Sequence, residues 1–241
     1  FARNVIAHAK DLHSIIEGIS YLVSNKGIAA IEFHYAKKIV SELQYDSIYH
    51  EHLFYFTLLT ISSLFEKYGL YAFDAQKSPI SGGALIVFFS KRRKKMTKKI
   101  KNIINDEQRS KVNTLKVWKE FSKKSKKHSI NLKQLINSYT MAEKIIAYGA
   151  SARSSTLLNY CGLSHKNISF IIDKNPLKNN KFSPGSNIPI VSFEKGIRKL
   201  IHKKVVLLLA WNFKKEILND LRNNGFTGKV IVPLPKQIKI L

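Results

Sequence analysis

The spacing of apolar residues defines the elements expected in the first part of the chain. Residues 11–24 predict an amphipathic helix, because six apolar residues share one face: Leu12, Ile15, Ile16, Ile19, Leu22 and Val23. We expect this helix to end at Gly27 in a left-handed cap. Further helices are predicted at residues 36–43 and 57–68, and strands at residues 28–33, 70–74 and 84–89. This order is typical of a doubly wound sheet that ends in an antiparallel pair.

A long polar stretch separates this part from the rest of the chain. Residues 91–142 predict a helical connector, in which the lysine-rich run 123–127 is expected to break one helix from the next. Strands and helices then alternate, with strands at residues 144–147, 168–172, 204–210 and 229–232 and helices at residues 156–160 and 213–223. The alternation predicts a parallel sheet. The expected fold class is therefore α/β, with one domain over residues 1–90, the connector, and a Rossmann-like domain over residues 143–241.

Composition narrows the partners to be expected. The chain carries 41 Lys and Arg against 16 Asp and Glu, a net charge of +25, which attracts polyanions such as nucleic acid or an anionic membrane. Lys, Asn and Ile are all abundant and share A/T-rich codons, and the basic run 91–101 lacks interleaved aromatic residues. We therefore interpret the charge as compositional drift and expect neither a nucleic-acid nor a membrane partner.

Cysteine usage and hydropathy favour a cytoplasmic protein without a membrane span. Cys161 is the single cysteine, so these residues hold no intrachain disulfide and no cysteine zinc site, which fits a cytoplasmic protein. No apolar run approaches the ~18–20 residues of a membrane span.

Four adjacent side chains that can take part in proton transfer lie in one tetrapeptide, Tyr49-His50-Glu51-His52. A phenol, a carboxylate and two imidazoles can hold and orient a proton-transfer group that works near neutral pH. This combination is typical of an enzyme that removes a proton from carbon or oxygen. On a strand, His50 and His52 would also face one way as metal ligands do, but no further Cys or His cluster supports a metal site.

A second motif lies at the start of the Rossmann-like domain. The turn that begins at Gly149 resembles a dinucleotide fingerprint, with Asp173 where a ribose-binding acid is found, but it lacks the second and third glycines. Three interpretations stay open: a cofactor loop, a helix N-terminus that holds a phosphate or carboxylate, and a plain tight turn.

The chain resembles a known family along nearly its whole length. Residues 45–52 and 56–59 resemble the signature of the C-methyltransferases that use S-adenosylmethionine (SAM) and act on nucleotide-linked keto-deoxysugars. Further similar segments follow in the same order, at residues 4–8, 82–85, 148–152, 157–162, 172–176, 184–185, 188–190, 211–212 and 232–235. Ser81 stands where the family usually has His, and Arg153-Ser154 where it commonly has Lys-Gly.

The resemblance implies a protein of three parts: a small zinc domain with cysteine ligands, a SAM-binding domain, and a C-terminal Rossmann-like domain. We expect this chain to hold the C-terminal half of a class I methyltransferase sheet and the whole last domain. The zinc ligands and the glycine-rich SAM loop are expected upstream of Phe1, and the fragment alone is expected to be inactive.

The resemblance also implies roles for individual residues. His52 is expected to be the base that removes a proton next to a ketone, Glu51 to orient it or bind the sugar, and Tyr49 to hydrogen-bond the enolate oxygen or the base; His50 is left as support. Asn4 and His8 are expected to contact SAM. The residues expected to contact the substrate are Gly82, Gly83, Gly149, Ser151 and Arg153.

Two other functions stay open at this point. Charge and the Rossmann-like domain also fit a nucleotide- or nucleic-acid-binding module without catalytic activity, which predicts tight, steeply salt-dependent binding. The segment from Gly149 to Asp173 also fits a Rossmann oxidoreductase, which predicts nicotinamide binding.

Overall fold

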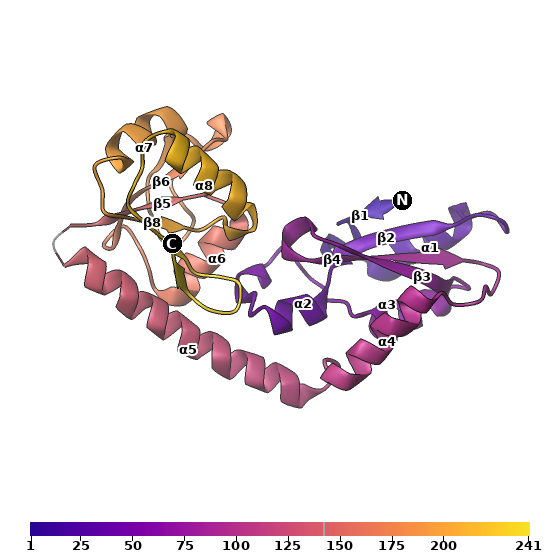
Figure 1. Cartoon of the computed structure of the whole chain (residues 1–241). Coiled ribbons are helices and arrows are strands. Elements are labelled where there is room, and N and C mark those ends of the chain that lie inside the picture. Colours follow the sequence, from indigo (N-terminus) through magenta and orange to yellow (C-terminus); the bar gives the residue numbers. More distant parts are fainter. Residues whose placement is uncertain (142) are drawn as a thin grey trace. The chain divides into compact units, whose positions relative to one another are not determined.

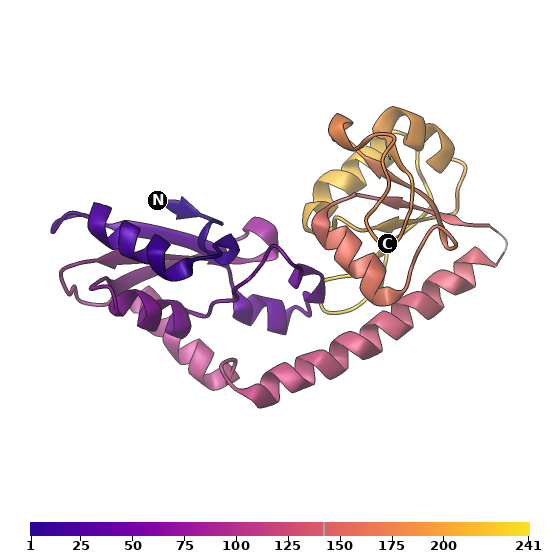
Figure 2. The same ribbon diagram turned by 180° about the vertical axis from the view of Figure 1, so that it is seen from behind.

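The computed structural model describes residues 1–141 and 143–241, and the chain divides into two compact units (Figures 1 and 2). Unit 1 comprises Phe1–Ser41 and His50–Phe121, and unit 2 comprises Glu42–Tyr49 and Ser122–Leu241. The short segment Glu42–Tyr49 thus belongs to unit 2 although the chain on both sides of it belongs to unit 1. Residue 142, where the predicted connector ends, lies outside the described residues.

Unit 1 is built on a four-stranded sheet of order β1-β2-β4-β3. Its strands are β1 (Ala2–Arg3), β2 (Ala29–His34), β3 (Tyr71–Ser78) and β4 (Ala84–Ser90). β1 runs parallel to β2, whereas β4 lies antiparallel to both β2 and β3. The mixed sheet confirms the α/β fold class, including the antiparallel strands expected at its end.

The helices α1 (Leu12–Leu22), α3 (Leu58–Glu66) and α4 (Lys98–Ser110) of unit 1 share one apolar core with this sheet. Helix α2 (Ala36–Ser41) follows β2. Alternate residues of the strands, including Ile31, Phe33 and Val87, are buried in one cluster with Ile61 and Phe65 of α3. The period-two pattern of the strands and the helical period of α3 therefore meet in a single core.

The predicted cap at Gly27 is wrong. Helix α1 already ends at Leu22, because Val23 takes an extended conformation. Gly27 is not left-handed, and its amide donates to the Ser24 carbonyl oxygen at 2.9 Å, closing a separate turn before β2.

The predicted break at residues 123–127 is also wrong. Helix α5 runs without interruption over Leu115–Thr140, and the chain instead turns at Lys111, which is left-handed at φ 51°. Lysine is a good helix former, so a lysine-rich run does not interrupt a helix by itself. The run also carries Ser125, which is buried on the same helix face as His128, Leu132 and Ile136.

Unit 2 contains a six-stranded sheet of order β10-β9-β8-β5-β6-β7. The strands are β5 (Ile145–Tyr148), β6 (Ile168–Asp173), β7 (Ile190–Ser192), β8 (Val205–Leu208), β9 (Lys229–Val232) and β10 (Lys239–Ile240). β5 to β9 pair in parallel, and β10 pairs antiparallel with β9. The predicted parallel sheet is confirmed, but the short strands β7 and β10 carry too few residues for the sequence pattern to predict them.

Three helices complete unit 2: α6 (Ala152–Cys161), α7 (Phe193–Leu200) and α8 (Lys214–Asn223). The strand order places the first strand, β5, between β6 and β8, so the chain reverses direction across the sheet at this point. Ligands bind at the carboxyl ends of the strands at such a switch point in open α/β sheets. Among the described residues, no helix is both long and apolar enough to cross a membrane.

Candidate active site

The tetrapeptide lies where the chain passes from one unit to the other. Tyr49 is the last residue of the segment assigned to unit 2, and His50 is the first residue after it in unit 1. His50 and Glu51 form a turn and are exposed, whereas Tyr49 and His52 are half-buried. His50 and His52 therefore do not lie on a strand, which the interpretation as a pair of metal ligands assumed. Within residues 1–141 and 143–241, no group of three His, Cys, Asp or Glu side chains is arranged to hold a metal ion.

Buried polar contacts hold the chain just before the tetrapeptide. The Asp46 carboxylate accepts hydrogen bonds from Arg153 Nε at 3.0 Å, from Arg153 Nη2 at 2.9 Å and from Trp211 Nε1 at 2.8 Å. The Arg153 guanidinium also lies over the Trp211 ring, 4.7 Å from its centroid. A carboxylate with 1 % exposure is stable only when its oxygens are hydrogen-bonded, and these donors meet that need.

A second buried chain of contacts begins at the neighbouring Tyr45. Its hydroxyl donates to His128 Nδ1 at 3.0 Å, and His128 Nε2 donates to the Pro233 carbonyl oxygen at 2.8 Å. Burial lowers the pKa of His128 below its usual value, which keeps the ring neutral and so able to accept from Tyr45. Cys161 Sγ lies 3.4 Å from the same hydroxyl, and burial raises the pKa of the Cys161 thiol to about 11. The thiol is therefore a structural group rather than a nucleophile.

Backbone contacts hold the chain just after the tetrapeptide. The amides of Leu53 and Phe54 both donate to the Ala7 carbonyl oxygen, at 2.9 and 3.3 Å. Phe56 then forms a parallel bridge with Tyr35, directly after β2. The segment after His52 is thus fixed to the residues that follow β1 and β2, two parallel strands whose carboxyl ends lie side by side.

These contacts gather three histidines in unit 1. The centroid of the His52 ring lies 4.8 Å from that of the His8 ring and 6.3 Å from that of the His34 ring. The centroid of the Tyr55 ring lies 6.2 Å from that of His52. His8 closes the short 3-10 helix Ile6–His8 after β1, and His34 is the last residue of β2. We call His8, His34 and His52 the histidine cluster. It joins two of the predicted site residues, His8 and His52.

Sequence reasoning missed His34. Its ring is buried, with 8 % exposure, while that of His8 is exposed. The available signal was its position at the end of an apolar strand, where functional side chains of α/β proteins are found. Its contact with the His52 ring, 18 positions further along the chain, cannot be read from that position alone.

The remaining predicted residues of unit 1 lie at the same ends of the strands. Asn4 follows β1 in the left-handed conformation, at φ 51°, and its amide donates to the Glu32 carbonyl oxygen at 2.9 Å. Gly82 and Gly83 lead into β4, whose first residue Ala84 pairs with His34. Gly83 has φ 126°, and a Cβ there would lie 2.9 Å from Lys38 Cγ, so packing alone accounts for this glycine.

Unit 2 places the residues around Gly149 in a turn that its own groups complete. A Cβ on Gly149 would lie 2.4 Å from Ala210 Cβ, and Ser151 caps helix α6 by accepting from the Ser154 amide at 3.1 Å. The Asp173 carboxylate accepts from the Ala150 amide at 2.7 Å. Arg153 pairs with Asp46 as described above. Structural contacts thus occupy these groups, and their predicted contact with substrate stays a prediction.

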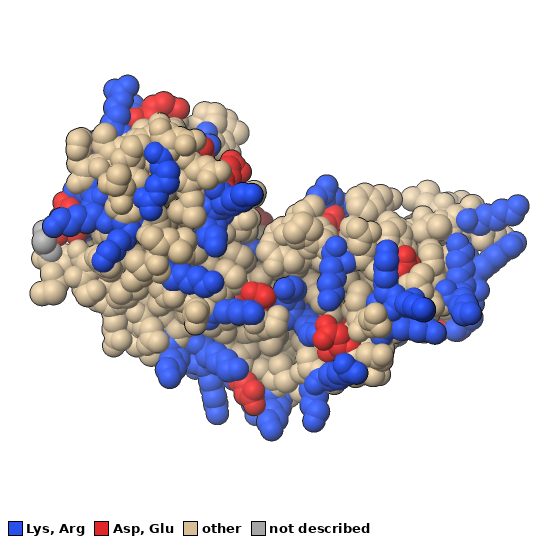
Figure 3. All heavy atoms as spheres, in the orientation of Figure 1, with Lys and Arg blue, Asp and Glu red and all other residues tan. Residues whose placement is uncertain are grey.

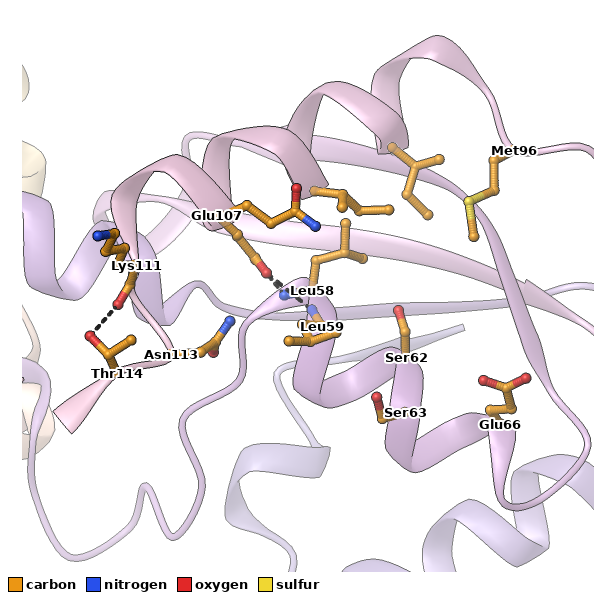
Figure 4. Close-up of a pocket in the computed structure, with 13 residues that line it drawn as sticks. Leu58, Leu59, Ser62, Ser63, Glu66, Met96, Glu107, Lys111, Asn113 and Thr114 are labelled. Atoms are coloured by element: carbon orange, nitrogen blue, oxygen red, sulfur yellow. Dashed lines mark hydrogen bonds between the residues drawn. The ribbon is translucent and has the colours of Figure 1, made fainter. Parts of the chain in front are cut away.

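A separate groove lies between α3 and α4 of unit 1 (Figure 4). Its volume is about 440 Å³, and its wall includes Leu58, Leu59 and Met96. Figure 4 shows Glu107 reaching from α4 to the start of α3, where its carboxylate accepts from the Leu58 amide at 2.6 Å. None of the residues predicted from the sequence as catalytic, cofactor-binding or substrate-binding lines this groove.

The mixed sheet of unit 1, with the histidine cluster at the ends of its parallel strands, and the parallel sheet of unit 2 define an α/β protein. The family model described as "C-methyltransferase C-terminal domain" matches residues 79–235, and the chain belongs to this family of C-methyltransferases. The chain is also 31 % identical, over 242 aligned residues, to C-methyltransferase NovU of Streptomyces niveus. That alignment covers 98 % of this chain and 57 % of the relative, so the chain spans little more than half the length of the relative.

Proposed function

We propose that the intact protein is a SAM-dependent C-methyltransferase that acts in the cytoplasm on a nucleotide-linked keto-deoxysugar. The methyl group goes to a carbon next to the ketone, through an enolate. The observation that carries this proposal is the half-buried His52 ring, held against His8 where β1 and β2 end. Family membership and the similarity to a C-methyltransferase support the reaction type.

In the proposed reaction, His52 is the general base. A ketone makes the neighbouring C–H acidic, and a neutral imidazole nitrogen accepts that proton while the C–H electron pair moves toward the carbonyl oxygen. Tyr49 donates a hydrogen bond to the oxygen as its negative charge develops, Glu51 orients His52 or binds the sugar, and His50 supports the turn. SAM supplies an electrophilic methyl group, so that the C–S bond breaks as the new C–C bond forms.

We propose that Asn4 and His8 hold one end of SAM. Asn4 and His8 follow the strand β1, and the exposed His8 ring is in contact with His52. An amide and an imidazole at this position would hold the methionine part of SAM and keep its methyl group near the base. The proposed removal of the proton uses side chains of this chain and no group of SAM.

We assign the substrate to the same end of the sheet. Gly82 and Gly83 lead into β4, whose first residue pairs with His34, and the half-buried Gly82 has no side chain that would keep a sugar away from its backbone. Gly83 is buried, so its contact with the sugar is the less direct part of this proposal. The contact of Gly149, Ser151 and Arg153 in unit 2 with the nucleotide part of the substrate is a separate proposal, which competes with the structural contacts of these groups. The net charge of +25 favours a ligand that carries a diphosphate.

The same contacts argue against a Rossmann oxidoreductase. A dinucleotide site needs an acid that is available to the ribose. The Asp173 carboxylate instead binds the Ala150 amide at 2.7 Å and Lys178 Nζ at 3.3 Å. We therefore interpret the turn at Gly149 as a tight turn that positions α6.

The test of the function is the variant His52→Gln in the intact protein. We expect methyl transfer from SAM to a nucleotide-linked keto-deoxysugar to fall by about 10²–10⁴-fold, the range for loss of a general base, with an unchanged circular dichroism spectrum. His13→Gln is the matched control, because His13 is an exposed histidine of the same unit. Near-normal turnover by His52→Gln, or turnover lost equally in both variants, contradicts the role of His52.

A further inference from the structure

The segment Glu42–Tyr49 has an unusual place in the chain. Unit 1 supplies the residues before and after it, yet the segment itself packs as part of unit 2. It ends at Tyr49, the first residue of the proposed catalytic tetrapeptide. Tyr49 therefore belongs to a different unit from His52.

Asp46 makes the contacts that fix this segment most specifically. Its carboxylate is buried, with 1 % exposure, and three N–H donors from two separate elements converge on it. Arg153 comes from the first turn of α6, and Trp211 from the 3-10 helix Trp211–Phe213 after β8. Both elements follow neighbouring parallel strands, β5 and β8, at the switch point of the sheet.

The geometry of these contacts leaves the segment little freedom. An arginine that binds one carboxylate through both Nε and Nη2 fixes the carboxylate in direction as well as in distance. The Trp211 indole adds a third donor, and its ring supports the guanidinium from one side at 4.7 Å. Tyr45 next to Asp46 is held independently through His128.

Chain length transmits this placement to the tetrapeptide. Tyr49 is three residues after Asp46, so its Cα lies within about 11 Å of the Asp46 Cα whatever the conformation between them. The segment between them is also held locally, because the Ser47 and Ile48 amides donate to the Gln44 and Tyr45 carbonyl oxygens at 3.0 and 3.1 Å. Loss of the Asp46 anchor is therefore expected to loosen the chain up to Tyr49.

We propose that Asp46, Arg153 and Trp211 are positioning residues for methyl transfer, which makes unit 2 responsible for the placement of Tyr49. This inference rests on the proposed function of the tetrapeptide. It gives Arg153 a task other than substrate contact: the guanidinium holds the carboxylate that sets the start of the catalytic turn. Loss of the anchor lowers the rate of the chemical step more than it weakens substrate binding.

The test compares Asp46→Asn and Trp211→Phe with the wild-type protein. Trp211→Phe removes one donor and keeps both the ring and the arginine fork, so it reports on positioning even where Asp46→Asn fails to fold. Asp220→Asn is the matched control. Asp220 is a partly buried carboxylate of helix α8 in unit 2, and it pairs with Lys174, which follows β6. Each variant is followed by amide hydrogen exchange of residues 47–52 and by steady-state kinetics of the intact protein.

We expect both anchor variants to speed amide exchange of residues 47–52 by about tenfold or more, while the amides of α8 keep their protection. We expect kcat to fall about 10–100-fold with KM changed less than about threefold, as for a small misplacement of a catalytic group. Asp220→Asn is expected to change neither quantity.

Two results overturn the inference. One is amide exchange that is faster over all of unit 2, and equally so in the anchor variants and in Asp220→Asn, which shows general destabilisation. The other is unchanged exchange at residues 47–52 with an unchanged kcat. Hydrogen exchange needs no substrate, so it decides the positioning role even where the proposed methyl transfer itself fails to appear.

Discussion

At the scale of single residues, two histidines of this chain meet opposite environments. His52 is half-buried among other rings. It belongs to the histidine cluster, in which the ring of the exposed His8 lies 4.8 Å from its own ring, measured between centroids. His128 is buried, and both its ring nitrogens are hydrogen-bonded, to Tyr45 and to the Pro233 carbonyl oxygen. The first environment suits proton transfer with a substrate, whereas the second keeps one neutral tautomer in place.

The environment of His128 predicts a pH dependence of stability. Its pKa is lowered in the folded state, whereas in the unfolded state it titrates near 6.5. As the pH falls through 6.5, the unfolded state binds a proton first, so the contribution of His128 is complete above this pH and is lost below it. We expect the free energy of unfolding, measured in urea, to fall between pH 7.5 and about pH 5.

The variant His128→Gln separates this effect from other titrations. It keeps a polar side chain but has no proton to bind in this range, so its unfolding free energy is expected to depend less on pH than that of the wild type. His13→Gln serves as the exposed control. An equal pH dependence in all three proteins contradicts the assignment.

At the scale of secondary-structure elements, the sequence predicted elements best where one periodic pattern decides them. Helices α1 and α3 and strands β2 and β4 lie within a few residues of their predicted ranges, because apolar spacing and burial agree there. Helix α5 shows where this fails: its lysine-rich centre suggested a break, yet buried Ser125 and His128 continue its inner face. Polar residues on an inner face cannot be recognised until their partners are known.

The start of α3 makes a second prediction at this scale. Glu107 of α4, with 3 % exposure, accepts from the amides of Leu58 and Leu59 and from the Tyr35 hydroxyl. A carboxylate at a helix N-terminus is favourable both as an acceptor and as a negative charge. We expect Glu107→Gln to lower the free energy of unfolding of unit 1 by about 1–3 kcal/mol, since an amide brings N–H groups toward those amides.

Glu66→Gln is the matched control for this change. Glu66 ends the same helix and pairs with Arg93 in solvent, with both side chains more than half exposed. An exposed ion pair contributes at most about 1 kcal/mol. Urea unfolding of both variants checks the contrast, and equal effects would show that Glu107 does not stabilise the start of α3.

At the scale of the whole molecule, the excess of basic residues is spread over many elements. Figure 3 shows Lys and Arg over much of the visible face, with few Asp and Glu between them. Helix α5 alone carries Lys116, Lys119, Lys123 and Lys127, all exposed. Such a surface attracts any polyanion through long-range forces that salt screens.

This distribution predicts weak and unselective binding to nucleic acid. We expect fluorescence anisotropy with two unrelated DNA duplexes to show equal affinities at low salt and a steep loss of binding toward physiological salt. Tight binding at physiological salt that prefers one sequence would instead favour the nucleic-acid-binding module. The assay thus decides between drift in composition and a functional basic surface.

Part of the candidate site could be predicted from the sequence. Tyr49, His50, Glu51 and His52 stood out because four reactive groups adjoin in the chain, and His8 because of its resemblance to a family segment. His34, and the buried contact of Asp46 with Arg153, were not predicted. Both depend on residues brought together from distant parts of the chain, as in the 107 positions that separate Asp46 from Arg153.

Removal of a proton by His52 from the carbon next to a ketone can be measured directly. The intact protein is incubated in D₂O with a nucleotide-linked keto-deoxysugar but without SAM, and the signal of that C–H is followed by proton NMR. We predict that the wild type exchanges this hydrogen for deuterium and that His52→Gln does so at the uncatalysed rate, whereas His13→Gln exchanges it normally. Exchange by His52→Gln as fast as by the wild type would contradict the account.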